Sequence, residues 1–302
     1  MDRTTTGILM MVGFCVFAPI MDAMAKATPH EYPIAEILAA RFSVQVVLLL
    51  PVAYFLNALL RPTLKEAGHH MLRGFLLLVA TAFFFSAIRH MPIANAMAIF
   101  FVEPFILTAL GAFFLNETIG PRRVVACVVG FGGALLVIKP SFSDLGLVAL
   151  FPLGTALCFA LYVVLTRSMA QKLNPVTMQA YTAIAASLLL LPLLWWFDGS
   201  GVAAFDPVYP TGIAVWTLLA VGILAGVSHL MLSVALRLTP AGTIAPLQYL
   251  EIAGSVAVGY FMFKDFPDTL TWIGISIVVA SGVYVFARER MASITRQPAP
   301  PA

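Results

Sequence analysis

Two glutamates, Glu103 and Glu251, each stand near the middle of a long apolar stretch of this sequence. A carboxylate at the depth of a bilayer costs about 2.5–3.5 kcal/mol on insertion scales, so an acid placed there usually has a function. Such acids can bind a polar or cationic group, exchange protons, or only tie two helices together. The residue after Glu103 is Pro104, which removes a backbone donor and predicts a helix bend beside the acid.

Arg41 is the one basic residue that the sequence places well inside an apolar span. A buried guanidinium needs a partner, and the candidates are Asp22, Glu36 and Glu103. A structural salt bridge and a clamp for an anionic group of a substrate are both consistent with this position. Asp22 and Lys26 lie one helical turn apart, which predicts a local ion pair or a role at the mouth of a cavity.

Further residues are expected to line a cavity around these groups. Gln248 and Ser255 lie about one turn before and after Glu251 and share its helix face. His229 is either a proton relay for Glu251 or a structural histidine bonded to a neighbouring helix. Candidates for which packing is the default interpretation are Asn95, Gln45, Tyr249, Tyr162 and Trp216. Bends that would let the cavity open are expected at Pro104, Pro19 and Pro246.

Signatures of an enzyme or of a cofactor site are missing from the sequence. It contains no Walker, H-E-x-x-H or G-x-S-x-G pattern. The run Gly130–Gly133 lies inside an apolar span with no strand before it, so it predicts close helix contact and no nucleotide loop. His69 and His70 are expected in a solvated loop, and the three cysteines are expected to be packing residues. We therefore predict no enzyme activity, no cofactor and no bound metal.

The composition identifies the class of protein that must position these residues. Of 302 residues, 61% are hydrophobic and 10% are charged, whereas soluble domains carry about 25% charged residues. The sequence therefore predicts an all-α polytopic membrane protein, and its net charge of +3 gives no reason to expect nucleic acid. We expect ten transmembrane helices, at 6–27, 33–57, 70–88, 92–115, 121–138, 145–169, 175–197, 211–236, 240–263 and 269–287.

The basic residues predict the topology. If the N-terminus is cytoplasmic, that side carries Arg3, Arg61, Lys65, Arg73, Arg122, Arg123, Arg167, Lys172, Arg237, Arg288, Arg290 and Arg296. The other side then holds Lys26, Arg89, Lys139 and Lys264. This bias places both termini in the cytoplasm, with the protein in the cytoplasmic membrane.

An internal repeat relates the two halves of the chain. A shift of 148 residues superposes, in order, Arg89 on Arg237, Pro92 on Pro240, Glu103 on Glu251, Gly111 on Gly259 and Glu117 on Asp265. Earlier in the chain a shift of 141 residues superposes Lys26 on Arg167 and Pro51 on Pro192. Each unit has five spans, an odd number, so the two copies are expected to be inverted in the membrane. Inverted repeats are typical of secondary transporters, with the substrate site between the repeats.

The residues at the repeat ends carry a family resemblance. The motifs NETI at 116–119 and GFGGALL at 130–136 resemble the end of an EamA-type repeat, and KD at 264–265, TWIG at 271–274 and SG at 281–282 resemble its second copy. The whole pattern resembles the drug/metabolite transporter superfamily. The segment 21–26 resembles the subset with riboflavin and S-adenosylmethionine carriers, although Gly13-Phe14 replaces the Trp-Gly of many members.

The resemblance implies repeats at 1–140 and 141–288, followed by a disordered cytoplasmic tail at 289–302. It also implies a secondary active or facilitative carrier of a small organic solute, working by alternating access in either direction. Expected partners are the solute, the lipid bilayer and protons, in a monomer or weak homodimer. The alternatives are an intramembrane enzyme and a membrane sensor or scaffold that transports nothing.

Overall fold

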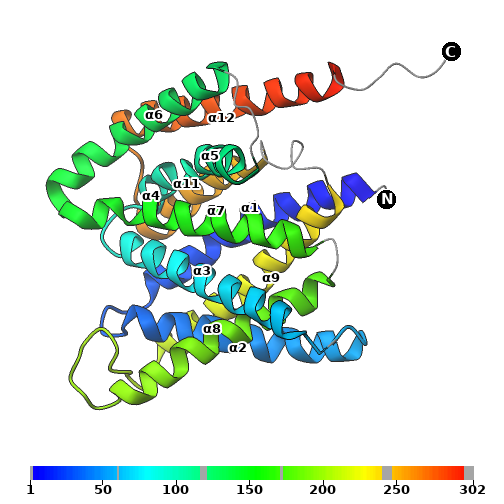
Figure 1. Ribbon diagram of the computed structural model, residues 1–302. Helices are drawn as coiled ribbons and strands as arrows, with labels where there is room; N and C mark the ends of the chain where they lie inside the picture. The colour runs from blue at the N-terminus through cyan, green and yellow to red at the C-terminus, as the bar shows by residue number, and fades with distance from the viewer. Residues whose placement is uncertain (1–2, 60, 116–120, 171–172, 240–246, 296–302) are drawn as a thin grey trace.

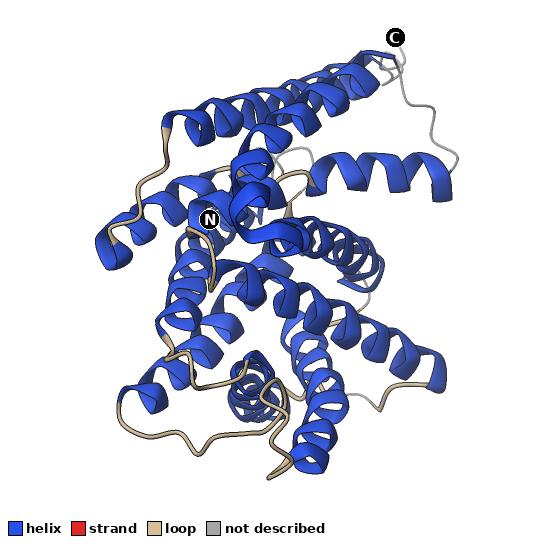
Figure 2. Cartoon of the chain, turned by 90° about the vertical axis from the view of Figure 1, so that its left-hand side faces the viewer, coloured by secondary structure: helices blue, strands red, loops and turns tan. Residues whose placement is uncertain are grey.

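The structure is a computed structural model that describes residues 3–59, 61–115, 121–170, 173–239 and 247–295 (Figure 1). The regular structure in these ranges is helical, with no strand, and loops join the helices (Figure 2). The helices are α1 (Arg3–Ala27), α2 (Ile34–Phe55), α3 (Leu64–Ile88), α4 (Ile93–Phe100), α5 (Glu103–Leu115), α6 (Pro121–Leu145), η1 (Gly146–Leu150), α7 (Phe151–Ala170), α8 (Pro175–Phe197), α9 (Ile213–Leu238), α11 (Leu250–Val258), η2 (Gly259–Phe263) and α12 (Thr269–Thr295).

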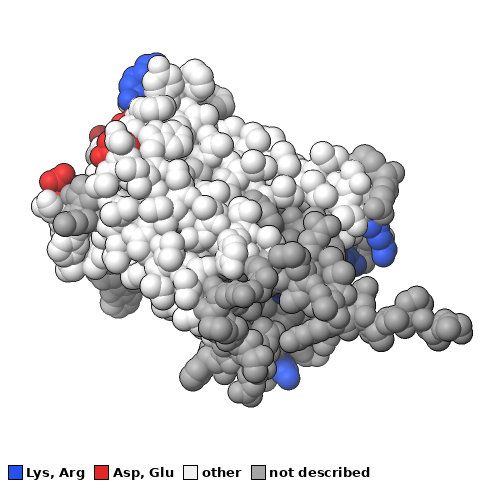
Figure 3. All heavy atoms as spheres, turned by 90° about the horizontal axis from the view of Figure 1, so that it is seen from above, with Lys and Arg blue, Asp and Glu red and all other residues white. Residues whose placement is uncertain are grey.

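Six of the described helical stretches are long and apolar enough to cross a membrane. Four shorter apolar stretches coincide with other expected spans, namely Ile93–Leu107, Val124–Ile138, Leu250–Phe263 and Thr269–Tyr284. Large apolar side chains cover the outside of the bundle, and Phe55 and Trp195 are 80% and 79% exposed. On the face seen in Figure 3, the charged residues of the described part lie at the edges. The architecture is therefore that of an all-helical, multi-pass membrane protein.

Two helix boundaries differ from the expected spans for local reasons. α3 begins at Leu64 instead of His70, because Thr63 and Glu66 form a reciprocal capping box, with Thr63 N donating to Glu66 Oε2 at 2.8 Å. α12 continues to Thr295, so residues 289–295, expected in the disordered tail, are helical. That segment contains neither Gly nor Pro, whereas Pro298 lies beyond the described residues. At the start of α12, Thr271 N donates to Asp268 Oδ1 at 2.7 Å and lowers the pKa of Asp268.

The two spans that carry the glutamates are both interrupted beside the acid. The first ends as α4 at Phe100 and restarts as α5 at Glu103, so Glu103-Pro104 opens the second segment. The second is interrupted at Tyr249, and Glu251 lies in the first turn of α11. A carboxylate in the first turn of a helix interacts favourably with the helix dipole. The repeated sequence feature thus corresponds to a repeated backbone feature.

The closest helix pairs each join the two halves of the chain. α1 packs along α9, α3 along α7, α2 along α8, and α6 along α12; in Figure 1 the last pair lies at the top of the view. α6 and α12 approach closely at Gly133 and Gly274, where a Cβ on Gly274 would lie 2.8 Å from the carbonyl oxygen of Gly133. Small residues at such crossings are typical of membrane helix packing.

Candidate functional site

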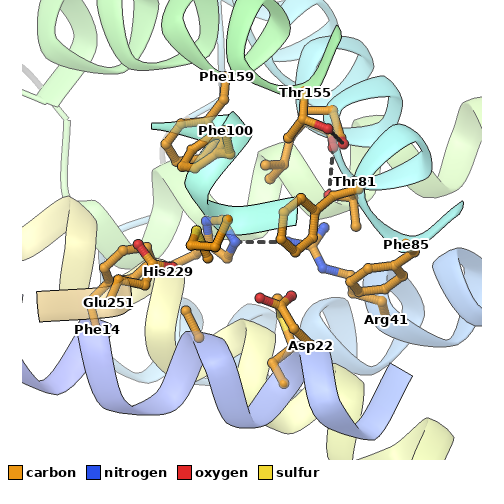
Figure 4. A pocket seen from close by; sticks show the side chains of 16 residues that line it. Phe14, Asp22, Arg41, Thr81, Phe85, Phe100, Thr155, Phe159, His229 and Glu251 are labelled. Carbon is orange, nitrogen blue, oxygen red and sulfur yellow. Dashed lines mark hydrogen bonds between the residues drawn. The ribbon is translucent and has the colours of Figure 1, made fainter. Parts of the chain in front are cut away.

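One pocket lies where helices of both halves meet, between α1, α2, α3, α4, α7, α9 and α11 (Figure 4). Its wall is mainly apolar and includes the rings of Phe14, Phe85, Phe100 and Phe159. The space inside is about 60 Å³, enough for a few water molecules. Pockets that hold drug-sized ligands measure roughly 300–1,000 Å³. The pocket is therefore too small in this conformation for a ligand of that size.

Four ionisable side chains interrupt this apolar wall. Asp22 comes from α1, Arg41 from α2, His229 from α9 and Glu251 from α11. All four were expected from the sequence as residues of one site, and the structure places them around one space. Each is at least nine-tenths buried, and Arg41 is completely inaccessible. Buried ionisable groups inside membrane helices are costly, so their convergence is characteristic of a binding or transport site.

Arg41 and His229 form the direct polar contact across the pocket. Arg41 Nη2 lies 2.8 Å from His229 Nε2, and a dashed line marks this contact in Figure 4. A guanidinium carries only donors, so Nε2 must be the acceptor, and the histidine is neutral with its proton on Nδ1. The expected carboxylate partners of Arg41 do not form this bond. Glu36 instead accepts a hydrogen bond from Val208 N at 2.9 Å.

The two pocket carboxyls are close to other charges without being bonded to them. Asp22 interacts electrostatically with Arg41 and with Glu251, and Figure 4 shows it directed from α1 toward Arg41. Within the described ranges, neither acid forms a hydrogen bond or a salt bridge. The predicted local pair of Asp22 with Lys26 is wrong, because the Lys26 ammonium binds Asp265 Oδ2 at 2.7 Å. Asp22 is therefore available to the pocket.

Glu103 belongs to a neighbouring cluster and does not line the pocket. It is 2% exposed, its Oε1 has no partner among the described residues, and it interacts electrostatically with Glu251, Arg167 and Tyr249. Tyr249 stacks on Phe101, with ring centroids 5.0 Å apart. The two glutamates are thus electrostatic neighbours, of which Glu251 lines the pocket and Glu103 does not.

The remaining predicted positions lie around this centre. Ser255 is completely buried, and its Oγ has no partner among the residues described. Gln248 and Asn95 are half-buried outside the pocket lining. Pro19 is buried within an unbroken α1, where it contacts Gly254, and Pro246 lies outside the described residues. The suggestion that Trp216 lines the cavity is wrong, because its side chain lies on the outside of α9 and is 70% exposed.

A family model for the EamA-like transporter family matches this chain twice, at residues 5–139 and 146–287. The protein belongs to that family. Each match carries one of the interrupted spans and two of the four ionisable pocket residues. The protein is accordingly a multi-pass membrane protein of the drug/metabolite transporter superfamily that transports small metabolites.

Curated relatives of this EamA-family protein are carriers named for different solutes. An S-adenosylmethionine uptake transporter of Rickettsia felis is 28% identical over 95% of this chain and 94% of its own length. A riboflavin transporter of Vibrio cholerae is 25% identical over 95% of both chains. The pseudopaline exporter CntI of Pseudomonas aeruginosa is 29% identical over 93% of this chain and 96% of its own. A solved crystal structure aligns with a TM-score of 0.62 at 17% identity, over 95% of this chain and 97% of that one, which shows a shared fold.

The sequence did not reveal a second buried network that supports the EamA-family pocket. Arg73 is fully buried and donates to Tyr162 Oη, Thr166 Oγ1 and the Met178 carbonyl, at 3.1, 3.2 and 3.1 Å. Gln179 Nε2 contacts Tyr162 Oη at 3.0 Å and the carbonyl of His229 at 3.0 Å. A chain of hydrogen bonds therefore leads from Arg73 to the backbone that carries His229.

Arg73 and His70 correct two expectations about the start of α3. Arg41 was expected to be the one deeply placed basic residue, yet Arg73 is also fully buried. His70 was expected in a solvated loop, but it is 4% exposed and packs edge-on against Tyr181 at 5.1 Å. The capping box at Thr63 moves the helix start upstream and brings both side chains inside the bundle. The T-x-x-E spacing at 63–66 was the signal that could have shown this.

Lys26, near the end of α1, connects three segments of the chain. Its Nζ binds Asp265 Oδ2 at 2.7 Å, donates to the Met91 carbonyl at 3.1 Å and lies 4.9 Å from the centre of the Phe263 ring. These contacts tie α1 to the turn before α4 and to the segment after η2, and so join the two halves of the chain.

Among the described residues no group of His, Cys, Asp and Glu side chains could hold a metal ion.

Proposed function

We propose that the pocket between Asp22, Arg41, His229 and Glu251 is the solute-binding site of a carrier that works by alternating access. One observation supports this most directly. Four buried ionisable side chains from four helices, two from each family-matched segment, converge on one apolar space. Movement of one half against the other would change the distances of Asp22 and Arg41 from His229 and Glu251. Such a site can bind its solute in one conformation and release it in another.

The helix packing supports two inverted repeats with ten crossings. Exchanging the halves replaces α1 by α7 and α3 by α9, so the pair α1–α9 becomes the pair α7–α3. Both of these pairs pack closely in the structure. The pairs α2–α8 and α6–α12 are each converted into themselves. A twofold relation between the repeats accounts for all four pairings and supports five spans in each repeat. We therefore propose ten spans, an even number that puts both termini on one side, and the bias of the basic residues favours the cytoplasmic side.

The contracted pocket and the Lys26 contacts support assignment of this conformation as a closed one. A volume of about 60 Å³ leaves no room for a metabolite, and the Lys26–Asp265 ion pair bridges the two halves at one end. The interruptions before Glu103 and Glu251 are positions at which the two spans can bend. We propose that the two spans bend further at these interruptions when the protein opens. The two halves then separate around the four pocket residues.

The relatives' names support a small organic metabolite as the solute and leave the direction open. Two names describe uptake or transport of S-adenosylmethionine and riboflavin, and one describes export of pseudopaline. Alternating access alone is reversible, so gradients and coupling ions decide the direction. Glu103 and Glu251 are placed to bind protons, and a pH gradient imposed on proteoliposomes measures whether protons accompany the solute.

The test is counterflow of labelled S-adenosylmethionine and labelled riboflavin in proteoliposomes. We expect wild-type protein to exchange at least one of these solutes, unchanged, against unlabelled solute inside. Asp22→Asn and Glu251→Gln should each reduce the exchange at least tenfold, because each removes a carboxyl group that can bind a cationic part of the solute or a proton. The matched control is Trp216→Phe, an exposed side chain on the helix that carries His229, and it should exchange like wild type.

Wild-type exchange that survives both pocket substitutions would refute the proposed site. Chemical change of the solute without counterflow would favour an intramembrane enzyme. Solute-dependent stabilisation of the protein without any flux would favour a sensor. Glu103→Gln separates the two clusters, since we expect it to retain solute binding better than Glu251→Gln does.

A further inference from the structure

Three nitrogen atoms in the pocket are buried and have no hydrogen-bond partner among the described residues. They are Nε and Nη1 of Arg41 and Nδ1 of His229. Arg41 is completely buried and His229 is 5% exposed, and both line the pocket. Buried donors without acceptors are rare in folded proteins, and each needs a physical explanation. Three of them on two neighbouring side chains indicate an acceptor that belongs to a ligand.

The geometry of the guanidinium decides what kind of acceptor fits. Its five N–H bonds form two forked edges, and Nη2 contributes one N–H to each edge. His229 uses one N–H of Nη2, through the 2.8 Å contact. Whichever hydrogen that is, the other edge keeps both of its N–H groups. The His229 contact therefore orients Arg41 and leaves a complete two-pronged donor edge, which matches the two oxygens of a carboxylate.

The side chains around Arg41 do not fill this edge. Asp22 interacts with Arg41 electrostatically, but their atoms are not within salt-bridge distance. The ring of Phe42 covers one side of the guanidinium, at 4.6 Å from its centroid, and cannot accept in the plane of the N–H bonds. Tyr162 is a further electrostatic neighbour of Arg41, and its hydroxyl already accepts from Arg73 and Gln179.

The charges of the pocket complete the description of the ligand. The Arg41 contact keeps His229 neutral, so Arg41 is the cation among these four groups, and a cationic group of a ligand would bind Asp22 or Glu251 in its ionised form. A ligand that matches them has one carboxylate for Arg41 and cationic centres for the two acids. The phenylalanine rings in the wall provide faces for a cation and for an apolar or planar body.

We propose that Arg41 and His229 form a carboxylate subsite, and that the solute is an amino-acid-like zwitterion with an additional cationic group. This rests on the proposed function, since it assumes that the pocket binds the solute. The carboxylate binds the free edge of Arg41 and the Nδ1–H of His229. The ammonium and the second cation, such as a sulfonium, guanidinium or further ammonium group, lie toward Asp22 and Glu251.

The test compares ligands that differ only in the carboxylate, in binding to purified wild-type protein in nanodiscs. The pairs are S-adenosylmethionine with its decarboxylated form, lysine with cadaverine, and arginine with argininamide. We expect the carboxylate member of at least one pair to bind about 10–100-fold more tightly, as a charge-assisted two-pronged contact allows. This comparison needs no substitution, so it does not depend on the folding of a variant.

Two variants then assign the preference to Arg41. Arg41→Gln should bring the affinity ratio of a pair close to one, and Arg41→Lys, which keeps the charge but loses the fork, should give an intermediate ratio. Asp22→Asn should weaken both members of a pair and leave their ratio unchanged. Equal binding within every pair, or binding of none of the zwitterions, would overturn the carboxylate subsite. If flux still depends on Asp22 and Glu251 in that case, the transport site itself remains correct.

Discussion

At the contact between α6 and α12, the interatomic distances predict how much a substitution would destabilise the protein. A Cβ on Gly133 would lie 2.8 Å from Cγ2 and 2.9 Å from Cβ of Ile277, and 3.0 Å from the Gly274 carbonyl oxygen. Neither a β-branched side chain nor a backbone carbonyl can move aside locally. Gly133→Ala therefore forces the two helices apart, and overpacking of this kind costs about 1–3 kcal/mol.

The neighbouring glycine is a matched control. A Cβ on Gly132 would meet no atom within 4 Å, so Gly132→Ala adds a methyl group without a clash. Both substitutions replace glycine by alanine inside the same helix, which favours the helix by about 0.5–1 kcal/mol in each case. This gain cancels in the comparison. The difference in stability between the two variants is then the packing cost alone, about 1–3 kcal/mol.

The assay is thermal unfolding of the purified variants in one detergent, followed by hydrogen exchange of α6 and α12. We expect Gly132→Ala to melt at or slightly above the wild-type temperature and Gly133→Ala to melt several degrees below it. Exchange should become faster in α6 and α12 of Gly133→Ala and stay unchanged in α2. Equal melting temperatures for the two variants would show that α6 and α12 do not approach each other as closely as the structure describes.

Three further predictions concern the polar contacts. Alanine substitution of Lys26 and Asp265, singly and together, should give a coupling energy of about 1 kcal/mol in unfolding, as for a partly exposed ion pair, and no coupling would mean that the pair does not hold the halves together. Thr63→Ala should cost about 1 kcal/mol and speed hydrogen exchange in the first turn of α3, because the capping box is lost. Tyr162→Phe should destabilise the protein by about 2 kcal/mol, since Arg73 loses a buried acceptor, and an unchanged melting temperature would contradict the network.

Much of the bundle was predictable because the membrane restricts helices to one length and composition. The span expected at 175–197 coincides with α8, since Asn174-Pro175 is a strong helix start and Asp198-Gly199 a strong stop. The start of α3 was missed, because an apolar pattern alone does not register a capping box upstream of it. The pairing of α6 with α12 was also not predictable, because glycines indicate a close contact without naming the partner helix.

The ionisable residues that line the pocket were predictable from the sequence, but their hydrogen bonds and ion pairs were not, and Glu103 lies outside the lining. Asp22, Arg41, His229 and Glu251 each stood out as a costly residue inside an apolar span, and a costly residue is visible in one sequence. Which of them meet depends on the crossing of helices far apart in the chain. Lys26 therefore pairs with Asp265 and not with Asp22, and Arg41 pairs with His229 and not with an acid. The network through Arg73 and Gln179 was missed because each residue resembles a boundary or packing position when read alone.

The repeat explains why a symmetric backbone can carry an asymmetric solute. The shift of 148 residues that relates Glu251 to Glu103 also relates His229 to Thr81, and the shift of 141 relates Arg41 to Thr182. Thr81 lines the pocket together with its counterpart His229, whereas Glu103 lies outside the lining.

The two halves therefore preserve the helix pairing on which the proposed alternating access depends, while their residues differ at the pocket. An inverted backbone with identical pocket residues would present the same groups from both sides. This chain instead presents its guanidinium from α2 and its imidazole from α9, with a threonine at the equivalent position of the other half in each case. A bound zwitterion then has one favoured orientation, which stays fixed while the halves move around it.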